Sequence, residues 1–390
     1  MFGRNKSSKL KIAIIDDGFD WHVAHKFKNI RPHFLELKNN RLHKQRGIWK
    51  IYLSSHGTRC FAIYANATQS LPTYDAFLIK IIDDSTQRAS LCNLEAAFLW
   101  CLENKINMIS ISLGTTYYRD FEPIQNIVNL LVQNGTIIVA AHSNDNFISF
   151  PAAAQNVIGV HCDYTAKLLK EHQYILLYGD RNHIDIMGCS KFSGLDNILY
   201  DDEIENYNSY ATPYIAALIH NTIIENNNMH TELLDFFASN NTIIKNFNYW
   251  NYIKPAIIHA TTINIPVIAF FQDSKNSSIP EFINKLCATF IEEGYIATSI
   301  NLSASKNMFD FSYQYLHTLG IYARKDMISY VSYYTQANLL FIQLPQGSTD
   351  YNYIDLILDE KGGHCFPIPS FKFDISTPNS TYIKIKDFFM

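Results

Sequence analysis

A serine in a position suited to nucleophilic chemistry lies in the segment Tyr207–Pro213. The segment reads Tyr-Asn-Ser-Tyr-Ala-Thr-Pro and leads into an apolar run that ends at Ile219. This run predicts a helix, and Pro213 is compatible with its first turn because amides there have no partner within the helix. Ser209 would then lie where free N–H groups and the helix dipole favour negative charge, which suits an oxyanion forming at its hydroxyl. The alternative is a serine that only caps a helix or a turn.

Two further segments offer the partners that a serine nucleophile needs. The apolar run of residues 12–15 ends at Asp16 and Asp17, and such runs are typical of central strands in a parallel sheet. Catalytic groups gather at the carboxyl ends of these strands. His56 follows Ser55, a suitable N-cap, and a histidine at a helix start is held less readily as a cation. The pattern therefore predicts a neutral His56 that can act as a base.

Paired acids at a strand end have a second interpretation, because phosphate-receiver domains hold Mg²⁺ with acids in that place. Such a domain needs a further aspartate at the end of a later strand to take the phosphate. Asp83 and Asp84 are the only nearby candidates, and no suitably placed lysine strand follows them. We therefore disfavour the receiver interpretation.

The elements around these residues alternate between strands and helices. Residues 93–104 and 121–133 carry apolar side chains at helical spacing, whereas residues 108–114 and 136–141 are short buried-strand patterns with turns after them. Repeated strand–helix alternation is the mark of a doubly wound, mostly parallel α/β sheet. Such a sheet would bring the strand ends that carry the polar residues to one edge.

Residues 9–225 resemble the subtilisin-like serine peptidases, with the family's motifs in the family's order, aspartate before histidine before serine. The matching segments are Ile14–Gly18 for the aspartate motif (V-I-D-S/T-G), Ser55–Thr58 for the histidine motif (H-G-T-H-V-A-G), Ala140–Asn144 for the oxyanion segment (A-A-G-N), Ser209–Pro213 for the serine motif (G-T-S-M-A-x-P), Ile109–Gly114 for the strand at the substrate cleft and His183–Gly188 for the strand before the serine loop.

The resemblance implies a serine endopeptidase. Ser209 would attack a peptide carbonyl, while His56 takes its proton and passes it to the leaving amine. Asp16 would fix the tautomer of the imidazole and stabilise the imidazolium. The side chain of Asn144 and the backbone N–H of Ser209 would donate to the oxyanion. This chemistry calls for no cofactor or metal, and the calcium-binding loops of secreted relatives cannot be picked out.

The resemblance also implies a peptide-binding cleft. A bound peptide would pair with Ser112, Leu113 and Gly114 as an additional strand. Ala141 and Ser143 would line the P1 pocket, which takes the side chain before the scissile bond. The expected partner is therefore a peptide or protein, such as a specific precursor.

Several positions depart from the family motifs. The glycine two places before the nucleophile is Tyr207, the threonine before it is Asn208, and the glycine before the oxyanion asparagine is Ser143. Residues 59–62, Arg-Cys-Phe-Ala, replace H-V-A-G and predict a bulkier helix face. Tyr207 predicts a different loop path, because glycine reaches backbone regions closed to tyrosine, and Ser143 predicts a narrower P1 pocket. A catalytically weak or inactive peptide-binding module is therefore the alternative function.

Composition limits the compartment and the partners. Of the 390 residues, 47% are apolar and 17% are charged, which is typical of a globular protein, and the net charge of −4 indicates neither a nucleic-acid nor an anionic-membrane partner. The four apolar residues before Asp16 are too few for a signal-peptide core, and no run approaches a membrane span. We expect a cytoplasmic protein without a propeptide before Asp16, whose seven cysteines, lacking C-x-x-C spacing, are reduced.

The chain is long enough for two domains, and we expect a peptidase domain at 1–250 and a smaller α/β accessory domain at 255–390. Strand patterns at 265–271, 295–300, 338–344 and 353–358 and a helical pattern at 279–293 support the second domain. We expect it to recognise substrate or partner, or to mediate self-association.

Residues 272–278 lack the glycines and the G-K-[ST] ending of a phosphate loop, so nucleotide binding is disfavoured. Residues 362–365 predict a turn rather than a metal site. The acids at 201–205 predict a solvated loop, or selection of a basic peptide.

Overall fold

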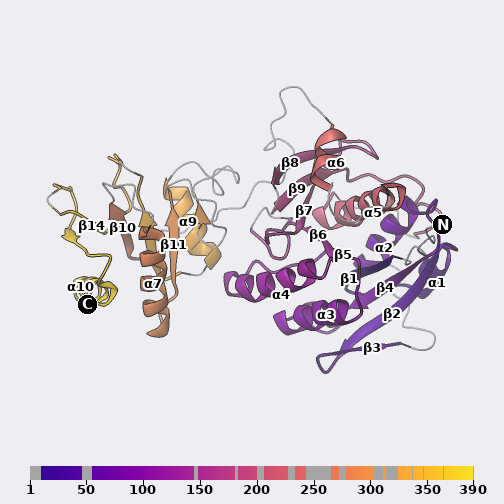
Figure 1. The fold of residues 1–390 in the computed structure, drawn as a ribbon, viewed down its shortest axis with the longest axis horizontal. Coiled ribbons are helices and arrows are strands. Elements are labelled where there is room, and N and C mark those ends of the chain that lie inside the picture. The colour runs from indigo at the N-terminus through magenta and orange to yellow at the C-terminus, as the bar shows by residue number, and fades with distance from the viewer. Residues whose placement is uncertain are drawn as a thin grey trace, which may run out of the picture. The chain divides into compact units, whose positions relative to one another are not determined.

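The structure is a computed structural model of the 390-residue chain. It describes residues 10–45, 55–144, 148–180, 183–199, 206–226, 233–242, 265–271, 278–302, 311–312, 324–335, 337–345, 347–362 and 364–389. The chain divides into two compact units, Met1–Pro255 and Ala256–Met390, both visible in Figure 1. We describe each unit by itself. The acids expected to form a loop at 201–205, and most of the segment 272–278, lie outside the described residues.

The described part of the first unit is built on a nine-stranded sheet in the order β3-β2-β4-β1-β5-β6-β7-β9-β8. Neighbouring strands are parallel except for the pairs β2–β3 and β8–β9. This confirms the predicted doubly wound, mostly parallel α/β fold. The strands are β1 (Lys11–Asp16), β2 (Ile30–Lys38), β3 (Arg41–Lys44), β4 (Tyr74–Lys80), β5 (Met108–Ile111), β6 (Ile137–Ala141), β7 (Ile158–Cys162), β8 (Tyr174–Asp180) and β9 (His183–Gly188).

Helices cover both faces of this sheet. Figure 1 shows α3 and α4 together on one side and α2 and α5 on the other. The helices of the unit are α1 (Trp21–His25), α2 (His56–Ala67), α3 (Leu91–Glu103), the short 3₁₀ turn η1 (Tyr118–Asp120), α4 (Phe121–Gln133), α5 (Asn208–Asn226) and α6 (Leu233–Ser239). Among the residues described, no helix has both the length and the apolar character needed to cross a membrane.

The central strand β1 shows why the sheet presents polar groups at its carboxyl edge. Ile12, Ala13, Ile14 and Ile15 are all buried, since β4 and β5 flank the strand and helices cover its faces. Burying apolar side chains stabilises the fold by about 25 cal/mol per Å² of surface removed from water. A shift in register would expose some of these side chains, so burial also fixes the register of the strand. The first polar side chain after this run is therefore Asp16, placed at the carboxyl end.

The start of α5 differs from the sequence prediction. The helix begins at Asn208, so Ser209 lies in its first turn and Pro213 in its second, rather than Pro213 in the first. A proline inside a helix leaves the carbonyl four residues earlier without its usual N–H partner. Here that carbonyl belongs to Ser209, and it accepts hydrogen bonds from Ser112 Oγ (2.9 Å) and Cys60 Sγ (3.4 Å). The carbonyl that Pro213 leaves without a helical partner is thus bound by side chains from two other segments.

The second unit is a smaller α/β unit. Its described strands form a sheet in the order β12-β11-β13-β10-β14-β15, in which all neighbouring strands are parallel. The strands are β10 (Val267–Phe271), β11 (Ala297–Asn301), β12 (Phe311–Ser312), β13 (Leu339–Gln343), β14 (Leu356–Asp359) and β15 (Ser370–Lys372), and the helices are α7 (Ile279–Glu292), α9 (Arg324–Thr335) and α10 (Pro378–Phe389). The predicted α/β character of this region is confirmed; its role stays a prediction.

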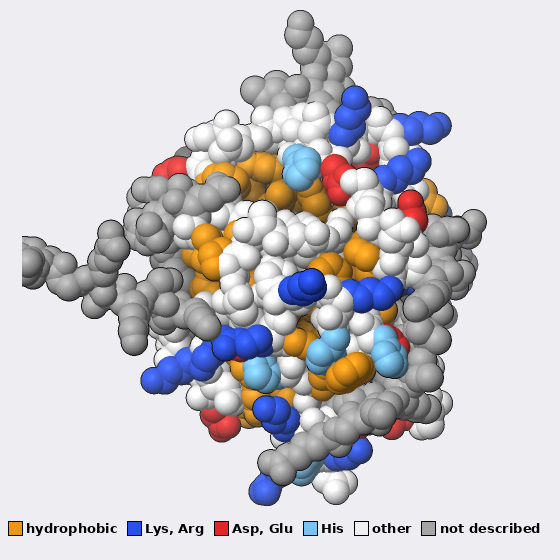
Figure 2. Space-filling model, turned by 90° about the vertical axis from the view of Figure 1, so that its right-hand side faces the viewer, with side chains coloured by type: hydrophobic (Ala, Val, Ile, Leu, Met, Phe, Trp, Pro, Cys, Tyr) orange, Lys and Arg blue, Asp and Glu red, His pale blue; other side chains and the backbone are white. Residues whose placement is uncertain are grey.

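Charged side chains are dispersed on the face shown in Figure 2. Lysine and arginine side chains stand among acidic, histidine and apolar ones, and the described residues of this face form no continuous basic stripe. Nucleic-acid-binding proteins usually gather their basic residues in such a stripe.

Candidate active site

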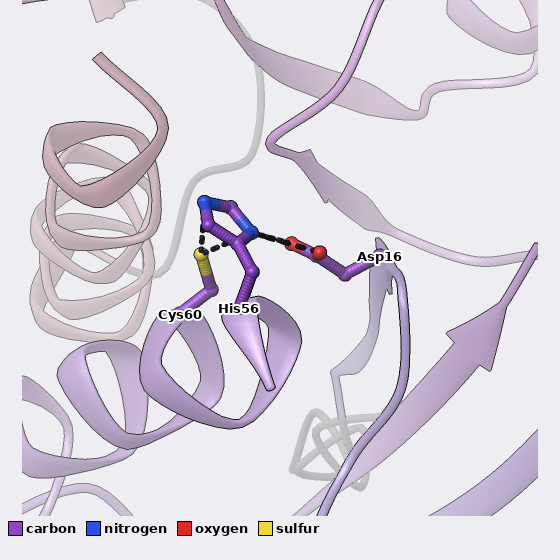
Figure 3. A group of neighbouring side chains, drawn as sticks. All are labelled: Asp16, His56 and Cys60. Atoms are coloured by element: carbon purple, nitrogen blue, oxygen red, sulfur yellow. Dashed lines mark hydrogen bonds and ion pairs between the residues drawn. The ribbon is translucent and has the colours of Figure 1, made fainter. Parts of the chain in front are cut away.

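Three side chains from distant segments form a hydrogen-bonded series at the carboxyl edge of the first sheet. The Nδ1 atom of His56 lies 2.8 and 3.0 Å from the carboxylate oxygens of Asp16, and its Nε2 atom lies 2.8 Å from Ser209 Oγ. Figure 3 shows Asp16 at the end of β1 with its carboxylate directed at the imidazole. Because a carboxylate only accepts, Nδ1 carries the proton of the neutral imidazole, and Nε2 is then left to accept from the serine hydroxyl.

The start of α2 is fixed by groups that surround His56. The Ser55 hydroxyl caps the helix by accepting from the Thr58 N–H, as predicted, and donates to the Gly18 carbonyl. Asp17 accepts from the N–H groups of His56 (3.1 Å) and Gly57 (2.8 Å). The second acid of the pair therefore caps the helix that carries His56, a role the sequence did not reveal.

Gly57 is required by this close approach. A Cβ atom at that position would lie 2.4 Å from the Gly18 carbonyl oxygen and 2.8 Å from Asp16 Cβ. Neither neighbour is a flexible side-chain end that could move aside. The glycine after the histidine thus lets α2 sit against β1 closely enough for His56 to reach Asp16.

Burial and charge act in opposite directions on His56. Burial is the largest single influence and lowers the pKa of the imidazole, but the charge and the hydrogen bond of Asp16, together with the contribution of Cys60, raise it by more in sum, so the pKa is raised overall. The pKa of Asp17 is raised as well, by burial and by repulsion from Asp16. Asp16 therefore favours the protonated imidazole that general base catalysis would create.

Cys60 lies one helical turn after His56, with its sulfur 3.7 Å from Nδ1 and 3.9 Å from Nε2 (Figure 3). Burial raises the pKa of this thiol to about 11, so it stays protonated at neutral pH. It donates to the Ser209 carbonyl and to Ser112 Oγ, both at 3.4 Å. Cys60 thus acts as a small packing group behind the imidazole and not as a second nucleophile in this arrangement.

Asn144 and Asn208 join the predicted oxyanion segment to the start of α5. Asn144 Oδ1 accepts from the Asn208 N–H at 2.9 Å, which fixes which end of the Asn144 amide is the donor. The Asn208 side chain donates to the carbonyls of His142 and Ser143 at 3.1 and 3.0 Å and accepts from the Cys162 N–H at 2.8 Å. The sequence identified Asn208 only as a departure from the family motif.

Tyr207 does not occupy a glycine-type backbone conformation. It is absent from the described non-glycine residues that have positive φ. The tyrosine therefore carries no left-handed strain, and the different loop path expected from it stays a prediction.

The predicted cleft residues follow β5 and β6. Ser112, Leu113 and Gly114 extend from β5, and a pocket of about 480 Å³ lies beside Leu113 and Gly114. Gly114 is needed there, since a Cβ atom would lie 2.6 Å from the Phe150 carbonyl oxygen. Ala141 ends β6 and is buried, whereas the Ser143 N–H donates to Ser149 Oγ at 2.9 Å. That these residues bind a peptide stays a prediction.

A second polar group consists of His142, which belongs to the predicted oxyanion segment, together with His161 on β7 and Asp185 on β9. His142 Nε2 is 2.7 Å from Asp185 Oδ1, and the two imidazoles stack with centroids 4.1 Å apart and planes 8° from parallel. Their nitrogen and carboxylate atoms are close enough to suggest a metal site. A metal binds imidazole in the ring plane, however, and two stacked parallel rings share no such position. We interpret the group as a hydrogen-bonded support for the end of β6.

The fold and the site together define a class of protein. A doubly wound α/β sheet with a hydrogen-bonded Asp-His-Ser series at its carboxyl edge is the arrangement of a serine-type peptidase. The chain belongs to the subtilase family, whose family model matches residues 7–261.

Comparison with individual proteins gives distant relatives. The chain is 24% identical over 218 residues to the minor extracellular protease Epr of Bacillus subtilis (strain 168). The matched region covers 54% of this chain and 31% of Epr. The chain thus spans about a third of that relative. Among solved structures it is similar to the protease domain of PatA (20% identity, TM-score 0.40, 56% of this chain and 82% of that one). It is also similar to the nisin leader peptidase NisP from Lactococcus lactis, with 16% identity and a TM-score of 0.42 over 62% of this chain and 84% of NisP.

Proposed function

We propose that the protein is a serine endopeptidase that uses Asp16, His56 and Ser209 as its catalytic triad. The observation that carries the proposal is the continuous hydrogen-bonded series from Asp16 through both nitrogens of His56 to Ser209 Oγ. In this order His56 takes the serine proton during attack on the carbonyl and then delivers it to the leaving amine. The attack forms the Ser209 Oγ–carbon bond, and collapse of the intermediate breaks the carbon–nitrogen bond.

Two donors would stabilise the oxyanion. The Asn208 N–H occupies Asn144 Oδ1, so the Asn144 Nδ2 group is the end left to donate. The backbone N–H of Ser209 lies in the first turn of α5, where amides have no partner within the helix. Donors that are already oriented before the reaction stabilise a developing charge most effectively.

We further propose that the substrate is a specific peptide or precursor held against residues 112–114. The proposal is supported by Ser143, which stands where the family motif has a glycine, and by Gly114, which lies against the backbone of Phe150. Covering a cleft wall with additional atoms limits which side chains it accepts. The cytoplasmic location and self-association through the second unit stay predictions.

Covalent labelling with a fluorophosphonate tests the proposed nucleophile without knowledge of the substrate. We expect the wild-type protein and Ser380→Ala, which removes an exposed hydroxyl from α10, to be labelled, whereas Ser209→Ala is not. Peptide mapping would place the adduct on Ser209. A folded, monodisperse wild-type sample that fails to label would favour the alternative, a peptide-binding module with the same fold.

A further inference from the structure

Two tyrosines before and after the nucleophile form an aromatic stack against His56. The Tyr210 ring lies with its centroid 4.9 Å from that of the imidazole, with 30° between the planes. Tyr207 continues the stack, 6.3 Å from Tyr210 at an interplanar angle of 22°. These are the positions at which the chain has tyrosine in place of the glycine and the methionine of the family's serine motif. Tyr210 thus contacts the imidazole directly, whereas Tyr207 contacts Tyr210.

Tyr210 is held in place from several sides. Its side chain is buried, 4% exposed, in an apolar cluster that includes Met187 and Tyr214, and Tyr207 packs against this cluster. Its hydroxyl lies 3.4 Å from Arg59 Nη1, a residue of the helix that begins with His56. Burial raises the pKa of the Tyr210 phenol, so the ring is uncharged at neutral pH. Tyr210 is therefore part of the packed interior, whereas Tyr207 and His56 are half-buried beside it.

A neutral aromatic face in this place has a consequence for the proton transfer. When His56 takes the serine proton it becomes a cation, and cations within about 6 Å of an aromatic centroid are attracted by the ring quadrupole. The charged or titratable groups around His56 are Asp16 and Asp17 at the end of β1, Cys60 and Arg59 on α2, and Tyr210 on α5. Asp16 acts on the ring nitrogen at its edge, whereas Tyr210 acts on the ring face.

We propose that Tyr210, supported by Tyr207, is a positioning residue that orients the His56 ring between Asp16 and Ser209 and stabilises its protonated form. The effect of Tyr210 on catalysis rests on the proposed function. The contact with His56, however, exists whether or not the protein turns over a substrate, so the two ideas can fail separately.

The kinetic test compares Tyr210→Met with Tyr210→Phe. Methionine has a similar reach and is the residue of the family motif, but it has no aromatic face, whereas phenylalanine loses only the hydroxyl. We expect Tyr210→Met to lower kcat by about three- to thirtyfold with little change in KM. The acid limb of kcat/KM should move to lower pH, because a less stabilised imidazolium loses its proton more readily. Tyr210→Phe should keep most of the wild-type kcat and most of the wild-type pH profile. Equal values for the two variants would overturn the proposal.

A second readout does not need activity. In the Ser209→Ala background, the His56 imidazole is titrated by NMR with labelled histidine in the proteins carrying Tyr210, Tyr210→Phe or Tyr210→Met. We expect the lowest midpoint in Tyr210→Met and similar midpoints in the other two; three equal midpoints would overturn the stack's role. If wild type resists the fluorophosphonate while the midpoints differ as expected, the proposed function fails and the stack stands. Tyr207→Leu should give a smaller shift in the same direction.

Discussion

Each of the two described sheets carries an aspartate–histidine pair after a strand end, and the pair in the first unit also contacts a serine hydroxyl. In the first unit His56 Nδ1 lies 2.8 Å from Asp16, and in the second His364 Nδ1 lies 2.8 Å from Asp359. Asp16 and Asp359 are both buried at the ends of their strands. By these measures alone the two pairs are alike.

The difference lies in what else each pair contacts. Asp359 and His364 are five residues apart, and Asp359 also accepts from the backbone N–H groups of Lys361 and His364, so this pair fixes a local turn. Asp16 and His56 are 40 residues apart, and His56 reaches Ser209, 153 residues further on. An aspartate–histidine pair can therefore act in catalysis when the fold places a reactive group from a distant segment beside the second nitrogen of the imidazole.

The largest expected effect separates the two histidines. His56→Ala should lower kcat by about 10⁴-fold or more, because the serine loses its base. The matched variant His364→Ala should leave kcat within about twofold, because its contacts stabilise a turn in the other unit. Steady-state hydrolysis of a peptide found by library screening gives both values. Comparable losses in the two variants would break the distinction between the pairs.

The next effect concerns the oxyanion. Asn144→Ala should lower kcat by about 10²–10³-fold with a smaller change in KM, because its donor is needed only when negative charge develops. The control Asn66→Ala removes an asparagine from α2 that donates to the Ser193 carbonyl, and it should leave kcat close to wild type. If Asn144→Ala instead raised KM at constant kcat, the asparagine would be a binding residue in the ground state.

The smallest effect concerns a histidine that has no place in the proposed chemistry. His220 is buried against Tyr64, whose hydroxyl lies 2.7 Å from its Nδ1, and burial lowers its pKa to about 4. The unfolded chain protonates near pH 6.5, so the free energy of unfolding should fall as pH drops from about 6.5 to about 4. The stability lost through His220 over this pH range should be about 3 kcal/mol.

Urea denaturation across that pH range, in wild type and His220→Gln, isolates the contribution of His220. Glutamine keeps an amide beside the Tyr64 hydroxyl but cannot take up the proton. The variant should therefore lose less stability on acidification than wild type does. Identical pH profiles for the two proteins would show that His220 is not a source of the acid sensitivity.

The sequence predicted the elements that carry strong local signals. The apolar runs of β1, β5 and β6 and the periodic pattern of α4 lie where expected, and their ends place Asp16 and the oxyanion segment at the sheet edge. The predicted start of α5 was wrong, because a proline can also lie in the second turn of a helix when the carbonyl four residues earlier finds another hydrogen-bond donor. Here Ser112 and Cys60 supply that partner from elsewhere in the fold.

Other features could not be read from sequence because their partners are far away or are backbone atoms. The strand β2 contains Pro32, and the structure tolerates it because β3 pairs only with the later residues Leu35–Lys38. Asn208 binds two carbonyls and an N–H from other segments, which carry no side-chain signature. The stack of Tyr210 on His56 likewise depends on how α5 packs against α2.

Coupling between Asp16 and His56 tests most directly the claim that the distant residues act as one unit. The measured quantity is the rate at which a fluorophosphonate modifies Ser209 in wild type, Asp16→Asn, His56→Ala and the double variant. If Asp16 acts only through His56, the double variant should react at the rate of His56→Ala, within about twofold. Losses that multiply in the double variant would show two independent effects and would contradict the account.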